Sequence, residues 1–461
     1  MNKKFQILIF MSLAACLLAA GCDQGFLDLK RDKTQVVPHS LGDYQALLDN
    51  VSIFNLRAGY HMNVIGSDEY TVEDDVWDLL SSTMQKNAYI WASDIFEGSQ
   101  SDVWNFGYER ILYANTVLDG LKDTEPDTGE RKLWRHVEGS ALFMRAYTYY
   151  QMAQTFAPVY RSDESHATLG LPLRLEMDIT MPVQRASLED TYNQMIGDLQ
   201  NAIPMLPEHA DSKFRPTRPA AYALLSKIFL LKDDYQSALA YADSCLQIRS
   251  VLLDYNGLDL SLRYTFSEFP YGESNPEVLY MELIPGQTIV NSSRFCIDME
   301  LYNLYEEGDI RKEAFFFPTR ETYTFKGSYT GSYSFFGGLA VDEVFLIRSE
   351  CYTRLGNLGR ALEDINHFLR NRYEADSFVP FTAQNEQGML VRLLEERRKQ
   401  LLCRGIRWED LRRFNKEDAF QIVLTRKLKG ETYTLPPDDV RYTWPIPDQV
   451  IRLSGIPQNP R

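Results

Sequence analysis

Two stretches of the chain share one pattern of hydrophobic positions, a pair of amphipathic helices joined by a short polar turn. In the later stretch, from Leu339 to Tyr373, a break at Gly356-Asn357 separates the two helical stripes. The second stripe has apolar residues at offsets 0, 3, 4, 7, 10 and 11 from Leu358, which form one face of an α-helix. The earlier stretch repeats these offsets from Tyr235. The pattern predicts a mainly α-helical body with an internal repeat.

The internal repeat resembles the tetratricopeptide helix pair. Ala238 and Ala361 each lie four residues past the turn residues Asp234 and Asn357, and such small side chains let two helices approach closely. Neighbouring pairs must then stack to bury their apolar faces. Two unrelated amphipathic hairpins would show the same periodicity, so this alternative stays open.

Further helices are predicted before the first of these hairpins. One begins near Trp104, a long one follows after a polar break, and a capping-box-like start at Ser187 predicts a third. We expect a single body at 40–461, with helical repeats at about 104–249 and 339–414.

Between the repeats, at about 250–338, the helical period disappears. The part from Arg311 to Gly338 combines many Phe and Tyr residues with Thr, Ser and Gly. A loop this long inside a helical body is often functional. We expect about half of its Phe residues to form local core. Its Tyr residues are better candidates for an open binding face.

Two other segments lack a helical period. Val278 to Ile284 predicts a strand. The C-terminal tail, 432–461, is rich in proline and is predicted to be extended and to wrap the surface.

Several residues are candidates for ligand contact, because aromatic faces can stack on the C–H surface of sugar rings. They come from the aromatic lobe and from an irregular, acidic and aromatic part at about 40–101. The candidates are Asp68, Trp77, Trp91, Tyr271, Tyr323, Tyr329 and Tyr333.

The N-terminal stretch has the pattern of a bacterial lipoprotein leader. Two lysines precede an apolar segment that is too short to be a lasting membrane span. The sequence Leu18-Ala-Ala-Gly-Cys22 resembles a lipobox, which predicts removal of residues 1–21, lipid modification of Cys22 and a polar tether at 22–39. More than one acyl chain makes such an anchor stable. Cys16 is a competing match, and an ordinary signal peptide with a free Cys22 is another alternative.

Composition narrows the classes of partner. With 44% hydrophobic and 24% charged residues the chain is typical of a globular protein. Its formal net charge of −16 disfavours binding to the phosphates of nucleic acids or to anionic lipid. The six cysteines include no CxxC or other close pair, so neither a zinc site nor a disulfide framework is predicted.

The sequence also lacks the common catalytic and cofactor motifs. HExxH, GxSxG, GxGxxG and P-loop patterns are absent, and the six histidines are isolated from one another. Adjacent carboxylates such as Asp74-Asp75 and Asp233-Asp234 could serve a glycosidase, but neighbours on a turn are more often solvated charges. The arginines between 397 and 413 have acidic neighbours and predict a structural ion-pair network. We predict no enzyme, no cofactor and no metal site.

One segment near the C-terminal end carries a family resemblance. It is Glu396-Arg-Arg-Lys-Gln-Leu-Leu-Cys-Arg-Gly-Ile-Arg-Trp-Glu-Asp-Leu-Arg-Arg413, and with it the chain strongly resembles the SusD/RagB family of Bacteroidetes outer-membrane lipoproteins. Supporting matches span the mature chain: Phe26-Leu27-Asp28, Trp104, Tyr108, Ile111, Asn115, Glu138, Arg145, Tyr149, Tyr192, Asp198, Gly308-Asp309-Ile310-Arg311, Pro445-Ile446-Pro447 and Gln458-Asn459-Pro460. Gln400, Arg404, Ile406 and Ala157 depart from the family pattern at scaffold positions.

The resemblance implies a tetratricopeptide-like α-superhelix with an irregular, loop-rich lobe that holds the ligand. It also implies a lipid-anchored location in the cell outer membrane, facing the outside, and a SusC-like TonB-dependent barrel as partner. The usual cargo of the family is an oligosaccharide, and some relatives take peptides. The family's binding residues vary too much to be carried over by motif.

Three functions are therefore compared. The first is a nutrient-binding lipoprotein that delivers an oligosaccharide to the barrel. The second is an envelope-anchored glycan-degrading enzyme, which would release new reducing ends. The third is a protein-interaction scaffold, which predicts that Ala at Tyr323, Tyr329 and Tyr333 leaves all ligand binding intact.

Overall fold

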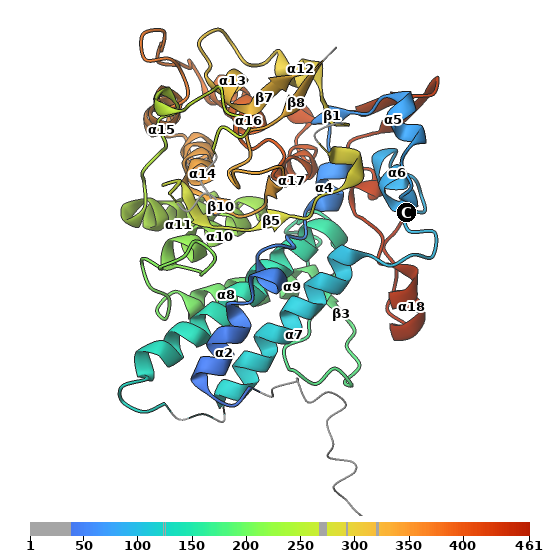
Figure 1. Ribbon diagram of the computed structural model, residues 1–461, viewed down its shortest axis with the longest axis vertical. Helices are drawn as coiled ribbons and strands as arrows, with labels where there is room; N and C mark the ends of the chain where they lie inside the picture. The colour runs from blue at the N-terminus through green and yellow to red at the C-terminus, as the bar shows by residue number, and fades with distance from the viewer. Residues whose placement is uncertain (1–37, 123, 125, 267–273, 292–293, 320–321) are drawn as a thin grey trace, which may run out of the picture.

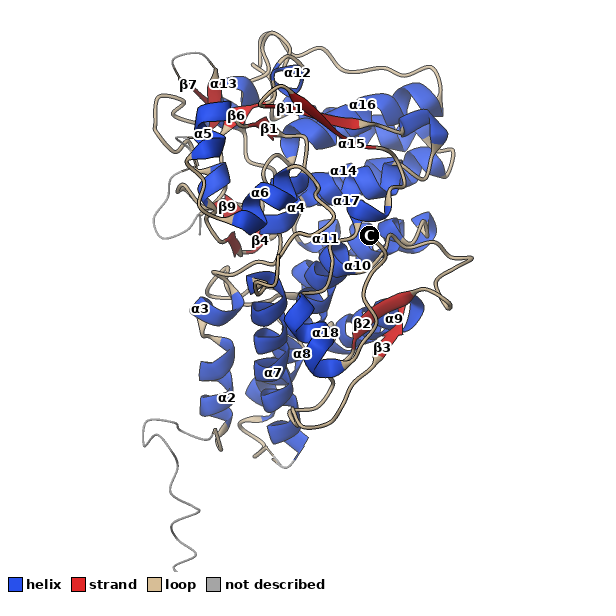
Figure 2. Ribbon diagram, turned by 90° about the vertical axis from the view of Figure 1, so that its right-hand side faces the viewer, coloured by secondary structure: helices blue, strands red, loops and turns tan. Residues whose placement is uncertain are grey.

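The computed structural model describes residues 38–461, apart from 123, 125, 267–273, 292–293 and 320–321. The described part is built mainly from helices, with short strands in pairs, as Figure 2 shows. The predicted mainly α-helical fold class is confirmed.

Long helices make up the lower half of Figure 1 and a broad layer above it. The helices of the first half of the chain are α2 (Leu41–Leu48), α3 (Val51–Phe54), α4 (His61–Gly66), α5 (Asp74–Asp78), α6 (Thr83–Tyr89), α7 (Asp102–Lys122), α8 (Arg131–Phe156), α9 (Leu188–Ala202), α10 (Arg218–Leu231) and α11 (Tyr235–Ile248). Those of the second half are α12 (Met299–Tyr302), α13 (Arg311–Phe315), α14 (Val341–Arg354), α15 (Leu358–Arg370), α16 (Glu386–Gln400), α17 (Ile406–Phe414) and α18 (Asp448–Ser454). Helix α8 packs between α7 and α9, and α2 lies against both α7 and α8.

The two hairpins predicted from the hydrophobic pattern are α10–α11 and α14–α15, and they turn in the same way. In the first, Asp233 has a positive φ of 58° and the Asp234 side chain accepts a hydrogen bond from the Ser237 N–H. In the second, Gly356 has a φ of 77° and Asn357 caps the next helix. A left-handed residue followed by a capping side chain ends one helix and starts the next.

The two hairpins are also neighbours in space, because α11 packs directly on α14. Each hairpin thus buries part of its apolar face against the other, as stacked repeats do. The tetratricopeptide-like geometry in detail stays a prediction.

Short antiparallel strands form the irregular part of the fold. The strands are β1 (Tyr70–Thr71), β2 (Leu169–Pro172), β3 (Arg185–Ser187), β4 (Val278–Tyr280), β5 (Leu283–Ile284), β6 (Cys296–Ile297), β7 (Phe316–Pro318), β8 (Tyr323–Phe325), β9 (Phe335–Phe336), β10 (Leu339–Ala340), β11 (Leu424–Leu428) and β12 (Glu431–Leu435). They pair as β1–β6, β2–β3, β4–β10, β5–β9, β7–β8 and β11–β12.

The strand predicted at Val278 to Ile284 is present but interrupted. It forms β4 and β5, separated by Met281 and Glu282. The Met281 N–H donates to the Lys213 carbonyl, while the Glu282 carboxylate is buried against Arg110 and accepts a hydrogen bond from Gln151. The Met281 N–H thus bonds to the connection between α9 and α10, while the Glu282 carbonyl accepts from the Gly337 N–H, so the pairing changes there from β10 to β9.

The extended C-terminal tail was only partly predicted correctly. It contains strand β12 and the helix α18, which begins after Pro447 and ends at Gly455, whose φ is 70°. Between them Trp444 and Ile446 are fully buried, so this part of the tail lies in the core rather than on the surface.

The arginine-rich segment forms the predicted structural network. Arg397 pairs with Asp410 at 3.0 Å, and Arg413 pairs with Glu350 of α14. All four side chains are buried, so their charges need these partners.

Candidate ligand-binding pocket

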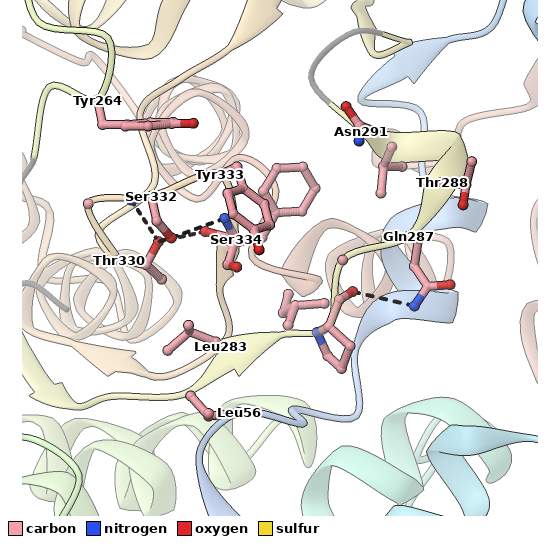
Figure 3. Close-up of a pocket in the computed structure, with 16 residues that line it drawn as sticks. Leu56, Tyr264, Leu283, Gln287, Thr288, Asn291, Thr330, Ser332, Tyr333 and Ser334 are labelled. Atoms are coloured by element: carbon pink, nitrogen blue, oxygen red, sulfur yellow. Dashed lines mark hydrogen bonds between the residues drawn. The ribbon is translucent and has the colours of Figure 1, made fainter. Parts of the chain in front are cut away.

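A cavity of about 880 Å³ opens in the irregular lobe (Figure 3). One wall is the chain that follows β5, including the short 3₁₀ turn Thr288–Val290, and the other is the loop 330–335 that leads into β9. Because β5 and β9 pair with each other, the two walls rise from one small sheet. Leu56 and Tyr264 complete the lining.

The first wall is held in place by a glutamine of α6. The Gln85 side chain accepts a hydrogen bond from the Ile289 N–H at 2.9 Å and donates to Oε1 of Gln287 at 2.8 Å. Figure 3 shows Gln287, Thr288 and Asn291 together on this side of the pocket. Since Gln85 is buried, the polar groups of this wall are fixed before any ligand arrives.

The second wall is a row of hydroxyl groups on alternate residues. The Thr330 hydroxyl lies 3.1 Å from that of Ser328 and 3.0 Å from that of Ser332, and it donates to the Ser334 carbonyl at 2.6 Å. Between them Gly331 takes a left-handed φ of 63°, which turns the loop. Tyr333 projects from this loop and is 71% exposed.

The described residues of the pocket lining are all uncharged. Among its sixteen described residues there is no Asp, Glu, Lys or Arg. Two arginines contact groups close to the lining: an Nη atom of Arg294 lies 3.5 Å from the Thr288 carbonyl, and the Arg263 guanidinium lies 5.0 Å from the centre of the Phe317 ring. The lining offers hydroxyls, amides, two tyrosine rings and apolar side chains.

A charged network lies buried nearby, around Tyr329. The Tyr329 hydroxyl is 2.5 Å from Glu277 and 3.0 Å from Asp342, and Gln400 donates to it at 3.0 Å. Burial raises the pKa of Glu277. Burial would also raise the pKa of Asp342, but the Arg404 guanidinium outweighs it and lowers that pKa. These groups hold the lobe onto α14 and α16 rather than face the cavity.

Of the residues predicted to contact ligand, the structure places Tyr333 in the pocket lining. Tyr323 is half-buried on β8 and stacks on Tyr302, with ring centroids 4.0 Å apart, outside the lining. Trp77 is half-buried on α5, with its ring 5.5 Å from that of Tyr89. Cys22 and Tyr271 lie outside the described residues.

Three of the predicted residues lie outside the pocket lining, and the expectation of an open face is wrong for Tyr329. Tyr329 is buried in the network described above. Trp91 is also buried, and its indole N–H donates to the Gly66 carbonyl at 2.9 Å. Asp68 pairs with Arg407 at 2.7 Å and with Arg398 at 3.1 Å. Burial opposes its ionisation, but these two guanidinium groups hold the pKa of Asp68 well below its usual range.

Sequence reasoning missed most of the pocket. Tyr264, Gln287, Thr288 and Asn291 carried no pattern that marked them. The Ser, Thr and Gly residues between 327 and 334 were noticed only as neighbours of tyrosines, although their alternating hydroxyls are the signal that could have identified the wall.

Two family models match the chain. One, described as "Starch-binding associating with outer membrane", covers residues 25–230, and a model of the SusD family covers residues 341–461. The chain belongs to the SusD family.

Among the described residues, no helix is both long and apolar enough to cross a membrane, and no grouping of His, Cys, Asp and Glu side chains is suited to a metal ion.

Curated relatives in the SusD family are distant. A SusD-like protein of Bacteroides ovatus is 23% identical over 367 residues, which cover 72% of this chain and 64% of the relative. SusD-like protein P2 of Formosa agariphila is 26% identical over 164 residues, or 36% of this chain and 30% of the relative. The chain therefore matches less than two thirds of the length of either.

Solved structures of the SusD superfamily share the whole fold. One from Bacteroides vulgatus has a TM-score of 0.75 at 19% identity and covers 92% of this chain and 99% of its own. One from Bacteroides thetaiotaomicron has a TM-score of 0.72 at 18% identity, covering 92% and 100%. A SusD-like carbohydrate binding protein from Bacteroides vulgatus has a TM-score of 0.66 at 18% identity, covering 90% and 97%.

Proposed function

We propose that this protein is an outer-membrane lipoprotein that binds a neutral oligosaccharide in the pocket of Figure 3 and delivers it to a SusC-like TonB-dependent barrel. The observation that carries the proposal is the composition of the pocket. Its walls combine an exposed tyrosine with fixed hydroxyl and amide groups and have no charged side chain among the described residues.

Tyr333 supplies the aromatic face. It stands on the hydroxyl-lined loop and is largely exposed, so a sugar ring can lie against it without displacing protein atoms. Stacking on an aromatic face contributes about 0.5–1.5 kcal/mol beyond area burial. The neighbouring Ser332 and Thr330 hydroxyls and the opposite Gln287 amide can then bond to the equatorial hydroxyls of the same ring.

The described wall residues, all uncharged, favour neutral sugars. A uronate or a sulfate entering the pocket would lose water without gaining a cationic partner among the described lining residues, which is costly. A neutral sugar has only hydroxyl groups to satisfy, and these match the donors and acceptors of the lining. The volume lies within the range of about 300–1,000 Å³ typical of small-molecule sites, so it suits a short oligosaccharide.

The same lining favours binding without cleavage. Glycosidases use two carboxyl groups that flank the scissile bond. None of the described lining residues carries a carboxyl group, so these residues offer a bound glycan neither the acid nor the base. An envelope-anchored glycan-degrading enzyme is therefore the less favoured function.

The anchor and the partner rest on the leader and on the family. The lipobox-like sequence before Cys22 supports lipid modification of that residue, with 22–39 as the tether. The match to a family described as associating with the outer membrane supports that location. Delivery to a SusC-like barrel, from the outer face of the membrane, is the corresponding role in the SusD family.

Affinity electrophoresis in gels that contain neutral polysaccharides tests the proposal. Wild-type protein should be retarded by at least one of them, and Tyr333→Ala should lose up to about tenfold in affinity. Tyr323→Ala is the matched control, because Tyr323 stacks on Tyr302 outside the pocket and should bind as wild type does. Release of new reducing ends, or retardation that is unchanged in Tyr333→Ala, would contradict the proposal.

A further inference from the structure

A cluster of exposed apolar side chains stands apart from the pocket, on the loop 173–184 between β2 and β3. Met177, Ile179 and Met181 are 55%, 66% and 56% exposed, and Leu175 adds a fourth apolar side chain. We call residues 173–184 the apolar loop. Single exposed apolar residues are common, but four on one short loop mark a surface that contacts something.

The apolar loop is held firmly, so its exposure is not a matter of a loose chain. Asn115 of α7 donates to the carbonyls of Arg174 and Glu176 at 3.0 and 3.1 Å. The Met177 N–H donates to Asp119, also on α7, at 2.7 Å. Near the other end of the loop, the Arg174 guanidinium donates to the Met181 carbonyl at 3.2 Å.

The first described residues of the chain lie at the C-terminal end of α7, the same end to which the apolar loop is bonded. The ring of Tyr44 packs against Gly120, the ring of Phe54 lies 6.4 Å from Tyr113, and Arg57 pairs with Glu109. From Tyr44 to Arg57 the chain therefore runs antiparallel to α7, and residues 38–43 lie at the C-terminal end of that helix. Figures 1 and 2 place the start of α2 and the loop below β3 at the lower end of the molecule in both views.

We infer that the apolar loop inserts into the lipid surface on which the protein is anchored. The inference rests on the lipid anchor proposed at Cys22. Residues 22–37 span at most about 55 Å when fully extended. They join the described body at residue 38, so that end of the body is the one held nearest the membrane. The apolar loop lies at that end, bonded to Asp119 in the last turn of α7.

The chemistry of the apolar loop suits lipid better than protein. Its exposed apolar side chains are aliphatic or thioether groups; it has none of the Trp and Tyr that dominate protein hot spots, and the guanidinium of its one arginine, Arg174, donates to the Met181 carbonyl. Apolar side chains of this kind lie about 5–10 Å deep, at the boundary between headgroups and acyl chains. Glu176 and Asp178 alternate with them and belong at headgroup level, so the contact is apolar rather than electrostatic and agrees with the acidic net charge.

A groove beside the loop extends the apolar surface. It has a volume of about 470 Å³ and is lined by Phe106, Ile111, Leu112 and Ile179, with the charged Glu109, Arg174 and Glu176 among its other lining residues. With the loop in the lipid, this groove along α7 would also face the acyl chains. The contact would set the tilt of the body on the membrane, while the acyl chains at Cys22 would keep it there.

Fluorescence quenching by brominated lipids tests the inference. The acylated full-length chain is placed in vesicles of phosphatidylethanolamine and phosphatidylcholine with bromine on the acyl chains, as wild type, Ile179→Trp and Val379→Trp. Val379 is the matched control, because it is 80% exposed and belongs to the segment between α15 and α16, two helices that Figure 1 shows at the opposite end of the molecule from α2. After subtraction of wild-type emission, the Ile179→Trp signal should be quenched several-fold more than the Val379→Trp signal.

The outcomes separate this inference from the proposed function. Mass spectrometry checks acylation, and affinity electrophoresis checks glycan binding, for each variant. Equal quenching of the two added tryptophans in acylated protein would overturn the inference and leave the anchor standing. Shielding of Ile179→Trp only after the barrel is added would identify a protein partner and would also overturn it. A mature chain without acyl groups would overturn the anchor and this inference together, while glycan binding would be unaffected.

Discussion

The indole rings of Trp408 and Trp444 stack with their centroids 5.0 Å apart and their planes 15° from parallel. Trp408 belongs to α17 and donates to the Tyr442 carbonyl, while Trp444 belongs to the C-terminal tail and donates to Asn63 of α4. Both rings are fully buried. The pair joins the tail, α17 and α4 into one core.

Removing one ring of this pair should therefore cost much of the stability. Trp444→Ala leaves a cavity and is expected to lower the free energy of unfolding by about 3–5 kcal/mol, measured by urea denaturation. Leu453→Ala is the control from the same tail, because Leu453 is exposed and should change little. An unchanged urea midpoint for Trp444→Ala would show that the tail does not contribute to the core.

The glycine beside the stacked rings leaves no room for a side chain. A Cβ on Gly66 would lie 2.6 Å from the Trp444 ring, so Gly66→Ala should destabilise by about 1–3 kcal/mol through overpacking. Gly197→Ala, in the middle of α9 with open space around it, should instead stabilise by about 0.5–1 kcal/mol. Thermal unfolding of the two variants in parallel measures this, and a shift of the same sign in both would refute it.

Stability should depend on pH through the buried Glu282. Burial raises the pKa of Glu282 to about 7, against 4.5 as its ordinary value. The folded state then holds the proton more tightly than the unfolded chain, so this group's contribution to stability falls as pH rises from about 4.5 to about 7. Relative to wild type, Glu282→Gln should gain stability over that interval, by up to about 1.4 kcal/mol per pH unit, and then level off.

Glu350 provides the opposite case as a control. Burial would raise its pKa, but Arg413 and Arg354 outweigh burial and lower the pKa of Glu350 to about 2. The contribution of the Glu350 carboxylate to the stability of the fold is complete above pH 4.5 and is lost only as pH falls toward 2. The difference between Glu350→Gln and wild type should thus be flat from about pH 5 to pH 8. A flat profile for Glu282→Gln over the same interval would count against the proposed titration.

Removing a tyrosine hydroxyl should destabilise the protein at Tyr329 of the lobe but not at Tyr333. Tyr329→Phe removes a buried hydroxyl that bonds Glu277 and Asp342, which should cost about 1–3 kcal/mol of stability and leave glycan affinity unchanged. Tyr333→Phe keeps the exposed ring and should leave stability and stacking as they are. Urea denaturation and affinity electrophoresis on both variants measure this. Loss of glycan binding by folded Tyr329→Phe would mean that the buried network acts on the ligand.

The helical layer could be predicted because its signals are local. The apolar offsets from Tyr235 and from Leu358, together with the turn residues before them, define hairpins that the structure reproduces. The helix α18 was missed because it is short and surrounded by prolines, so no period develops.

The pocket could not be predicted because it is assembled from four distant segments. Leu56, Tyr264, the chain after β5 and the loop before β9 meet only through tertiary packing. For the same reason the sequence did not separate Tyr329 from Tyr333. Both tyrosines stand among Thr, Ser and Gly, and the charged partners of the buried Tyr329 come from the residue before β4, from α14 and from the segment after α16.

The hydroxyl-bearing loop 330–335 is short and is held at one end by the small β5–β9 pair, away from the stacked helices. The residues of this loop can be replaced, as in the recognition loops of antibodies, because the helices beneath pack on one another. A graft of this segment from one relative to another should then transfer preference for a cargo without a redesign of the scaffold.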